Sequence, residues 1–190
     1  RLGSKGAVHP KLHGILLSDI VEKHLNALEK SCLRLPSRMY LFKKELNAAN
    51  IILTTLNSSR IDAMDEVFGE KSELPFLAVI IDEAGQCAEP ELLMPLVYPI
   101  ASKVIMIGDH RQLPATVFSS IATQTGYGRS LFERLYLNYE KSGIKNPMLS
   151  LDIQYRMQKE IARFPSAAFY YNKLLTPDGI GENKNIPLKP

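Results

Sequence analysis

The sequence predicts an α/β protein in which helices flank a parallel sheet. Three short apolar runs, two of them rich in Ile and Val, are typical of strands that are buried on both faces. The spacer between the second and third runs is long enough for the crossover helix that parallel strands require. A composition of 45% hydrophobic and 23% charged residues is ordinary for globular proteins and argues against disorder or a fibrous protein.

The first part of the chain is predicted to be helical. After an irregular lead-in over residues 1–14, apolar side chains fall on one helix face from Ser18 to about Leu33. Ser18 or Asp19 could cap this helix. A second, shorter helix is expected from Ser37 to Ala49.

The apolar runs that predict the sheet are Ile51–Thr55, Phe76–Ile81 and Lys103–Ile107. Within the spacer before the third run, Pro90 suits the first turn of a crossover helix, whereas Pro95 should kink or end it. The expected unit is therefore strand, helix and parallel strand.

Beyond the sheet, Ser130 and Glu133 have the spacing of a helix capping box and predict a helix over Leu131–Tyr139. A linker, a strand, a helix broken near Pro165 and a loose tail are expected to follow. Their ranges are Ser142–Pro147, Met148–Leu151, Met157–Tyr171 and Thr176–Pro190.

Bulk properties exclude several classes of protein. The two cysteines, Cys32 and Cys87, have no paired spacing, which argues against a disulfide framework or a zinc site. No apolar run approaches the length of a membrane span, and no signal peptide is visible. Because the first residue is Arg1, we expect a processed chain or a fragment. The net charge of +3 permits contact with a phosphate backbone without demonstrating it.

Two polar segments follow two of the predicted strands. Asp82 and Glu83 come directly after the Phe76–Ile81 run, where one carboxylate can hold Mg²⁺ and its neighbour can activate a water molecule. The second is Gly108–Pro114, whose Gln112 can sense a terminal phosphate by hydrogen bonding. Taken alone, the first could be a solvated acidic turn, and the second a turn capped by Asp109.

A third polar segment is Gln154–Met157. Its Tyr155 could stack on a nucleobase and its Arg156 could reach a phosphate, or the pair could simply be surface residues at a helix start. Together the three segments, Asp82–Gln86, Gly108–Pro114 and Gln154–Met157, resemble motifs II, III and the QYRM motif of superfamily 1 helicases in the senataxin and nonsense-mediated-decay branch. The resemblance covers nearly the whole chain.

This resemblance implies two RecA-like domains with ATP bound between them. Asp82 would coordinate Mg²⁺, Glu83 would activate water and Gln112 would sense the γ-phosphate, with Gly108 and Asp109 beside the nucleotide. Tyr155 would stack on adenine and Arg156 would act as an arginine finger. Thr54 and Thr55 would lie near the nucleic-acid backbone, a weaker inference.

The resemblance also implies partners and a location. Its members usually move 5′ to 3′ on single strands, so single-stranded RNA, DNA or an RNA–DNA hybrid is the expected partner. Senataxin-like members are usually nuclear. By the same comparison, residues 1–47 would be a helical insert, residues 48–146 the C-terminal half of the first RecA-like domain, and residues 147–190 the start of the second.

The sequence departs from the helicase pattern in three places. Ala115 stands where a second proline is common, and Gln158 where a histidine is common; we expect both to be tolerated. No G-x-x-x-x-G-K-[ST] occurs, so the loop that cradles phosphates is absent from this chain. Gly69–Ser72 lacks the required leading glycine.

Two other functions remain possible at this point. The absent loop would suit a helicase-shaped nucleic-acid-binding or scaffolding module without ATPase activity. The second alternative is a different P-loop NTPase, such as a superfamily 2 helicase. The presence of both the Gly108–Pro114 segment and the Gln154–Met157 segment argues against it, because such proteins lack that pair.

Overall fold

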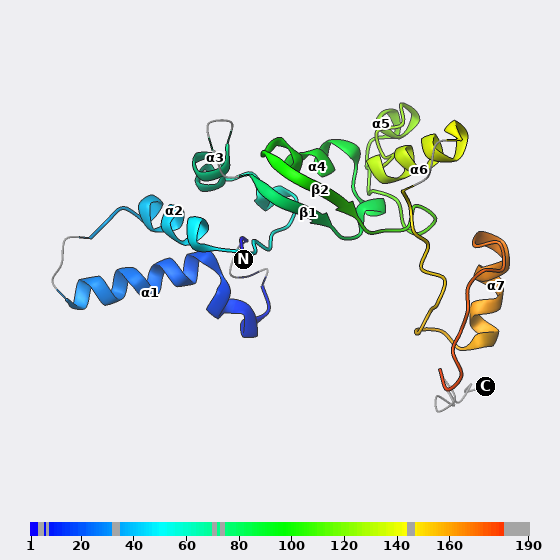
Figure 1. Cartoon of the computed structure of the whole chain (residues 1–190), viewed down its shortest axis with the longest axis horizontal. Coiled ribbons are helices and arrows are strands. Elements are labelled where there is room, and N and C mark those ends of the chain that lie inside the picture. The colour runs from blue at the N-terminus through cyan, green and yellow to red at the C-terminus, as the bar shows by residue number, and fades with distance from the viewer. Residues whose placement is uncertain are drawn as a thin grey trace. The chain divides into compact units, whose positions relative to one another are not determined.

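The structure is a computed structural model that describes residues 1–3, 6, 8–31, 35–69, 72, 75–143 and 147–180. Its chain divides into two compact units, Arg1–Leu135 and Tyr136–Pro190 (Figure 1). In the first unit, the helical elements that precede the sheet are η2 (Pro10–Ile15), α1 (Leu17–Lys30), α2 (Arg38–Ala48), η3 (Asn57–Ser59) and α3 (Asp62–Phe68).

The two helices predicted near the start of the chain are confirmed as α1 and α2. Ser37 caps α2, since its Oγ accepts from the Tyr40 N–H at 3.1 Å. The prediction for the α1 cap was wrong. Leu16 occupies the N-cap position without a side-chain bond, and Asp19 is buried inside the first turn. Leu16 is itself fully buried, so apolar packing fixes the start of this helix where a polar cap was expected.

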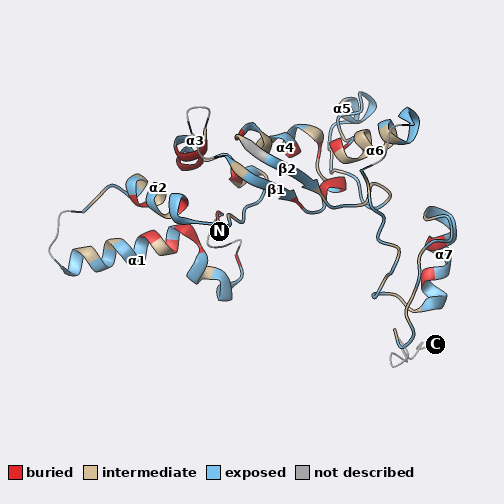
Figure 2. Cartoon of the chain, viewed as in Figure 1, coloured by how far each residue is buried: buried red, intermediate tan, exposed pale blue. Residues whose placement is uncertain are grey.

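The largest core of the first unit lies where α1, α2 and α3 meet. Its buried side chains are Leu2, Leu17, Val21, Leu41, Leu46, Ala63, Met64, Val67, Phe68 and Tyr98. Burying each large aliphatic or aromatic side chain stabilises the fold by roughly 1.5–3 kcal/mol. Figure 2 shows this burial on α3 and on the start of α1.

Tyr98 connects this core to the sheet. Its hydroxyl proton is shared between the Ser59 carbonyl oxygen at 2.9 Å and an Asp65 carboxylate oxygen at 2.8 Å. Burial and the Asp65 hydrogen bond raise the pKa of Tyr98 above its ordinary value, because the phenolate would be poorly solvated beside a carboxylate. The neutral tyrosine therefore holds α3 against the segment that enters the second strand.

The predicted strand–helix–strand unit is confirmed. β1 (Phe76–Ile81) pairs in parallel with β2 (Ile100–Met106), with Val79 opposite Val104. The crossover contains α4 (Glu89–Leu93), which has Pro90 in its first turn, and then η5 (Met94–Val97). The α-helix ends before Pro95, as expected from the proline ring.

The strand predicted over Ile51–Thr55 was wrong. Residues 51–55 are irregular, and Leu53 O accepts a backbone hydrogen bond from Leu2 N at 2.8 Å. An apolar run becomes a strand only where a neighbouring strand supplies a ladder of hydrogen bonds. The described sheet has two strands, β1 and β2.

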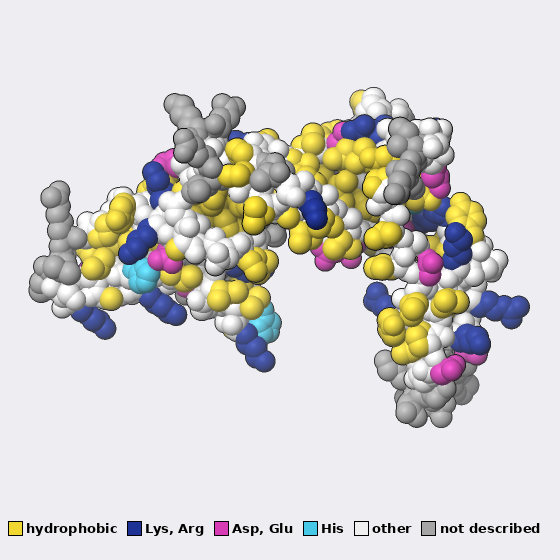
Figure 3. All heavy atoms as spheres, in the orientation of Figure 1, with side chains coloured by type: hydrophobic (Ala, Val, Ile, Leu, Met, Phe, Trp, Pro, Cys, Tyr) yellow, Lys and Arg dark blue, Asp and Glu magenta, His cyan; other side chains and the backbone are white. Residues whose placement is uncertain are grey.

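The expectation that the strands are buried on both faces was also wrong. Leu77 is 78% exposed and Ile80 is 65% exposed, although Ile81 at the end of β1 is buried. The described helices cover only part of this small sheet. Figure 3 shows hydrophobic side chains gathered at the surface around it.

In element order, the sheet is followed directly by α5 (Ser120–Gln124) and α6 (Leu131–Ser142). The predicted cap of α6 is confirmed in its serine half, because the Ser130 Oγ accepts from the Glu133 N–H at 3.1 Å. Arg134 on α6 donates two hydrogen bonds to the Glu89 carboxylate of α4, at 2.7 and 2.8 Å. This contact lowers the pKa of Glu89 and ties α6 to the crossover.

The second unit is built around α7 (Lys159–Phe169). Pro165 lies inside this helix, so the predicted break was wrong. Proline removes only its own N–H, and bonds continue on both sides: Ala162 N donates to Gln158 O and Tyr170 N to Ser166 O.

The strand predicted over Met148–Leu151 was wrong as well. Among the described residues of this unit, the extended pairing is one parallel bridge between Ile153 and Leu175. Residues 144–146 of the predicted linker and residues 181–190 of the predicted tail lie outside the described residues.

Candidate functional site

The carboxyl ends of β1 and β2 bring the first two polar segments together. Ile107 N donates to Ile81 O at 2.8 Å, and Ala84 N donates to Ile107 O at 2.9 Å. The chain therefore leaves both strands at the same edge of the sheet, where ligands bind in open α/β proteins. The turn that contains Asp82 and the turn that contains Gln112 share this edge, as the sequence predicted.

Two glycines allow these turns to touch through their backbones. A Cβ atom on Gly85 would lie 2.7 Å from the Asp109 carbonyl oxygen. A Cβ atom on Gly108 would lie 2.9 Å from Gly85 N and 3.0 Å from Ala84 N. Neither position has room for a larger residue, so the glycines are required by close approach and not by chain flexibility.

Replacing Gly85 by Ala is expected to destabilise the first unit. The added methyl group meets backbone atoms that cannot rotate away, so we expect the free energy of unfolding to fall by about 1–3 kcal/mol. Urea unfolding followed by circular dichroism measures this change. Gly14→Ala is the matched control, because a Cβ there meets nothing within 4 Å. Equal unfolding midpoints for the two variants would contradict the close approach.

The second residue of the acidic pair has an unusual backbone conformation. Glu83 lies in the left-handed region, with φ 53° and ψ 37°. This conformation costs about 1–3 kcal/mol outside glycine and persists only where neighbouring contacts enforce it. One such contact is local, since Glu83 N donates to Asp82 Oδ1 at 3.0 Å. Both side chains are exposed.

Gln86 orients the Glu83 side chain, a role that sequence reasoning missed. Its Nε2 donates to Glu83 Oε2 at 3.0 Å. The resemblance contained this residue but assigned no task to it. The only available signal was its spacing, since a residue three positions along a helical turn faces back toward the first.

Asp109 organises the second turn. Its Oδ1 accepts from Arg111 N at 2.9 Å, and its Oδ2 accepts from Gln112 Nε2 at 3.0 Å. The amide of Gln112 is therefore held in place on an exposed side chain. A neutral hydrogen-bonding group at this edge can contact a phosphate without adding charge.

The oxygen ligands at this edge suit Mg²⁺, but this chain supplies only part of a nucleotide-binding site. Mg²⁺ is usually held by one or two carboxylates and several waters, and Asp82 offers an exposed carboxylate. Among the described residues there is no group of three side chains that could enclose a metal ion. No phosphate-binding loop occurs in the sequence, so this chain alone lacks the usual backbone donors for the phosphates.

The third polar segment lies in the second unit. Tyr155 is 68% exposed, and Arg156 is also exposed. The side chain of Gln154 binds the backbone of the turn that carries them. Sequence reasoning assigned Gln154 no role of its own. Thr54 and Thr55 are exposed in the irregular segment of the first unit, where Thr54 Oγ1 donates to Thr55 O at 2.9 Å.

Comparison with known proteins identifies the family. Two family models, each described as an AAA domain, match residues 15–120 and 127–188. The helicase Sen1 of Schizosaccharomyces pombe is 40% identical over 140 residues, which cover 74% of this chain and 8% of that protein. The chain belongs to the AAA-domain family, in its senataxin-like superfamily 1 helicase branch.

Other relatives agree with this assignment. The probable helicase senataxin of Mus musculus is 38% identical over 71% of this chain and 5% of that protein. The probable helicase MAGATAMA 3 of Arabidopsis thaliana is 43% identical over 68% of this chain and 14% of that protein. This senataxin-like chain thus spans a small part of the length of the relatives it matches. The parallel strands and their crossover are those of a RecA-like helicase domain.

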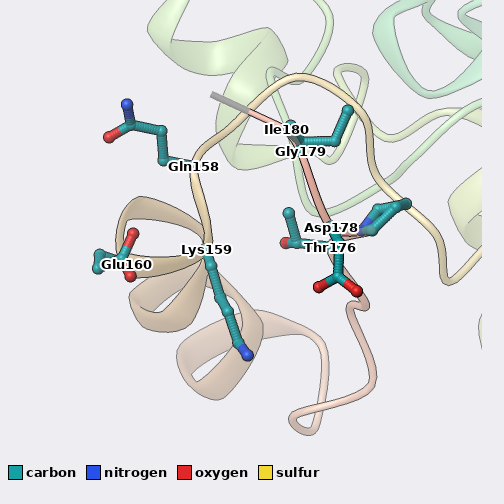
Figure 4. Close-up of a pocket in the computed structure, with 8 residues that line it drawn as sticks. Gln158, Lys159, Glu160, Thr176, Asp178, Gly179 and Ile180 are labelled. Atoms are coloured by element: carbon teal, nitrogen blue, oxygen red, sulfur yellow. The ribbon is translucent and has the colours of Figure 1, made fainter. Parts of the chain in front are cut away.

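A pocket and the character of the helices are further features of this senataxin-like chain. A pocket of about 290 Å³ lies between the start of α7 and residues 176–180, with Lys159 and Thr176 in its lining (Figure 4). No described helix has both the length and the apolar character that crossing a membrane requires.

Proposed function

We propose that the protein carrying this chain hydrolyses ATP with Mg²⁺ and couples hydrolysis to 5′-to-3′ movement along a single nucleic-acid strand. The observation that carries the proposal is the shared sheet edge. There the Asp82–Glu83 turn and the Gln112 turn meet in backbone contact. The similarity to proteins named helicases supports the same class of enzyme.

Each residue of the first unit has a proposed task. Asp82 binds Mg²⁺, and bound Mg²⁺ supplies charge neutralisation at the phosphates. Glu83 accepts a proton from the attacking water. Gln86 orients Glu83 for this task by donating a hydrogen bond to one of its carboxylate oxygens. Gln112, oriented by Asp109, donates to the terminal phosphate, and Gly108 lets the backbone approach the nucleotide.

In the second unit, Tyr155 stacks on the adenine base and Arg156 stabilises the charge of the transferring phosphoryl group. Thr54 and Thr55 are proposed to contact the nucleic-acid backbone. We assign residues 1–47 to a helical insert, residues 48–146 to the first RecA-like domain and residues 147–190 to the start of the second. A nuclear location is proposed from the senataxin-like relatives alone.

The test is ATP hydrolysis by the complete polypeptide that carries this chain. We expect single-stranded RNA or single-stranded DNA to stimulate hydrolysis, and directional substrates with a 5′ or a 3′ overhang to report polarity. The 190-residue chain alone should show little ATP binding, because it has no phosphate-binding loop.

Two outcomes would contradict the proposal. A complete polypeptide that binds single strands without hydrolysing ATP would support the helicase-shaped binding or scaffolding module instead. If no nucleic-acid strand stimulates ATP hydrolysis, hydrolysis is not coupled to movement on nucleic acid. RNA, DNA and RNA–DNA hybrid substrates are compared at one fixed salt concentration, because salt changes all such affinities.

A further inference from the structure

The side chain of Gln154 uses its whole hydrogen-bonding capacity within the turn that carries Tyr155 and Arg156. Its Oε1 accepts from the backbone N–H of Arg156 at 2.9 Å and of Met157 at 2.7 Å. Its Nε2 donates to the Met157 carbonyl oxygen at 2.7 Å and to the Thr176 hydroxyl at 2.6 Å. A primary amide has two donor hydrogens and two acceptor lone pairs, so no capacity is left for a substrate.

The neighbouring groups permit one orientation of this amide. Two backbone N–H groups face Oε1, whereas a carbonyl oxygen and a hydroxyl face Nε2. The reversed amide would place its donor hydrogens against two N–H donors and its oxygen against a carbonyl oxygen. The network of Gln154 with Arg156, Met157 and Thr176, called here the Gln154 network, is therefore specific for a glutamine amide.

The backbone of Gln154 is fixed by the segment that returns after α7. Gln154 N donates to Leu175 O at 2.9 Å, and Leu175 N donates to Asp152 O at 2.8 Å. Thr176 follows directly and lies next to the start of α7 (Figure 4). The turn is thus tied to the segment that returns after the helix, while Tyr155 projects with 68% of its surface exposed.

We propose that Gln154 is a positioning residue that holds the Gln154–Met157 turn in one conformation and so presents Arg156 and Tyr155 to the nucleotide. This inference rests on the proposed function for the tasks of Arg156 and Tyr155, but the Gln154 network itself does not depend on it. Gln154 acts through Arg156 and does not touch the phosphates. Displacing a catalytic group by about 1 Å can lower a rate by about 10²-fold.

The first arm of the test measures the network directly in the 190-residue chain. In Gln154→Ala, the amide hydrogens of Arg156 and Met157 lose their acceptor, and we expect each to exchange with solvent at least about tenfold faster. The amide of Ala162, which donates to Gln158 O inside α7, serves as the internal control and should not change. Unchanged exchange at Arg156 and Met157 would overturn the network.

A second variant covers the case in which Gln154→Ala does not fold. Gln154→Glu keeps an oxygen toward the Arg156 and Met157 N–H groups but loses both donated bonds. Its second oxygen faces the Met157 carbonyl oxygen, so we expect the two amides to exchange faster than in wild type but more slowly than in Gln154→Ala. Exchange in Gln154→Glu at the wild-type rate would show that the two donated bonds do not hold the turn, and exchange as fast as in Gln154→Ala would show that Oε1 does not protect these amides.

The second arm measures ATP turnover in the complete polypeptide. We expect Gln154→Ala to lower kcat by about 10–100-fold, and Gln154→Ala combined with Arg156→Ala to be no slower than Arg156→Ala alone. Multiplicative losses in the double variant, or an unchanged kcat in Gln154→Ala, would overturn the positioning role. Gln124→Ala on α5 is the matched control and should retain full activity.

The two arms separate the two possible failures. If the wild-type polypeptide hydrolyses no ATP, the proposed function fails, and amide exchange still decides whether the Gln154 network exists. If wild type is active and Arg156→Ala is slow, a fully active Gln154→Ala shows that the turn needs no positioning by this side chain.

Discussion

Replacing Arg156 by Ala is expected to lower the kcat for ATP hydrolysis by about 10³–10⁵-fold, because a positioned arginine stabilises the charge of the transferring phosphoryl group. The assay is single-strand-stimulated phosphate release by the complete polypeptide that carries this chain. Binding of a fluorescent ATP analogue should change far less, since the effect is confined to the transition state.

Arg163→Ala is the matched control for this variant. Arg163 is also an exposed arginine of the second unit, but it lies on α7 and outside the Gln154–Met157 turn. We expect it to retain turnover. If Arg163→Ala and Arg156→Ala lose activity equally, the loss reflects the general positive charge of this unit, and the specific role of Arg156 is wrong.

Replacing Glu83 by Gln should lower turnover by about 10²–10⁴-fold, the usual contribution of a general base. The amide keeps the size of the side chain but cannot accept the proton of the attacking water. Nucleotide affinity should be retained, because the proposed Mg²⁺ contact belongs to Asp82. Rapid-quench measurement of a single turnover separates this chemical step from product release.

The control for Glu83→Gln is Glu29→Gln, which changes an exposed carboxylate on α1. It should hydrolyse ATP at the wild-type rate. A Glu83→Gln variant with undiminished turnover would remove Glu83 from the mechanism. A variant that has also lost nucleotide affinity would instead assign Glu83 to binding.

The sequence allowed the shared sheet edge to be predicted because strand direction alone places it there. The apolar runs that end just before Asp82 and just before Gly108 form parallel strands, whose carboxyl ends lie at the same edge of the sheet. Individual contacts at that edge could not be predicted in this way. The residue type at position 83 does not indicate a left-handed backbone, because glutamate rarely adopts this conformation.

The failed predictions have two physical causes: partners far along the chain decide the Ile51–Thr55 run and the α1 cap, whereas local helix bonds decide the outcome at Pro165. The Ile51–Thr55 run has the composition of a strand, but a strand also needs a ladder, and Leu2 supplies one bond. Pro165 favours a break, yet the bonds before and after it preserve α7. Burial of Asp19 and Leu16 likewise depends on tertiary packing, which local patterns do not contain.

The backbone contact at Gly85 and Gly108 has a consequence for anyone who engineers this scaffold. Because a single methyl group on either residue would collide with the opposite main chain, the two loops cannot be redesigned or transplanted independently. A graft into another sheet would have to carry both loops as one cassette, together with the strand spacing that keeps them in register.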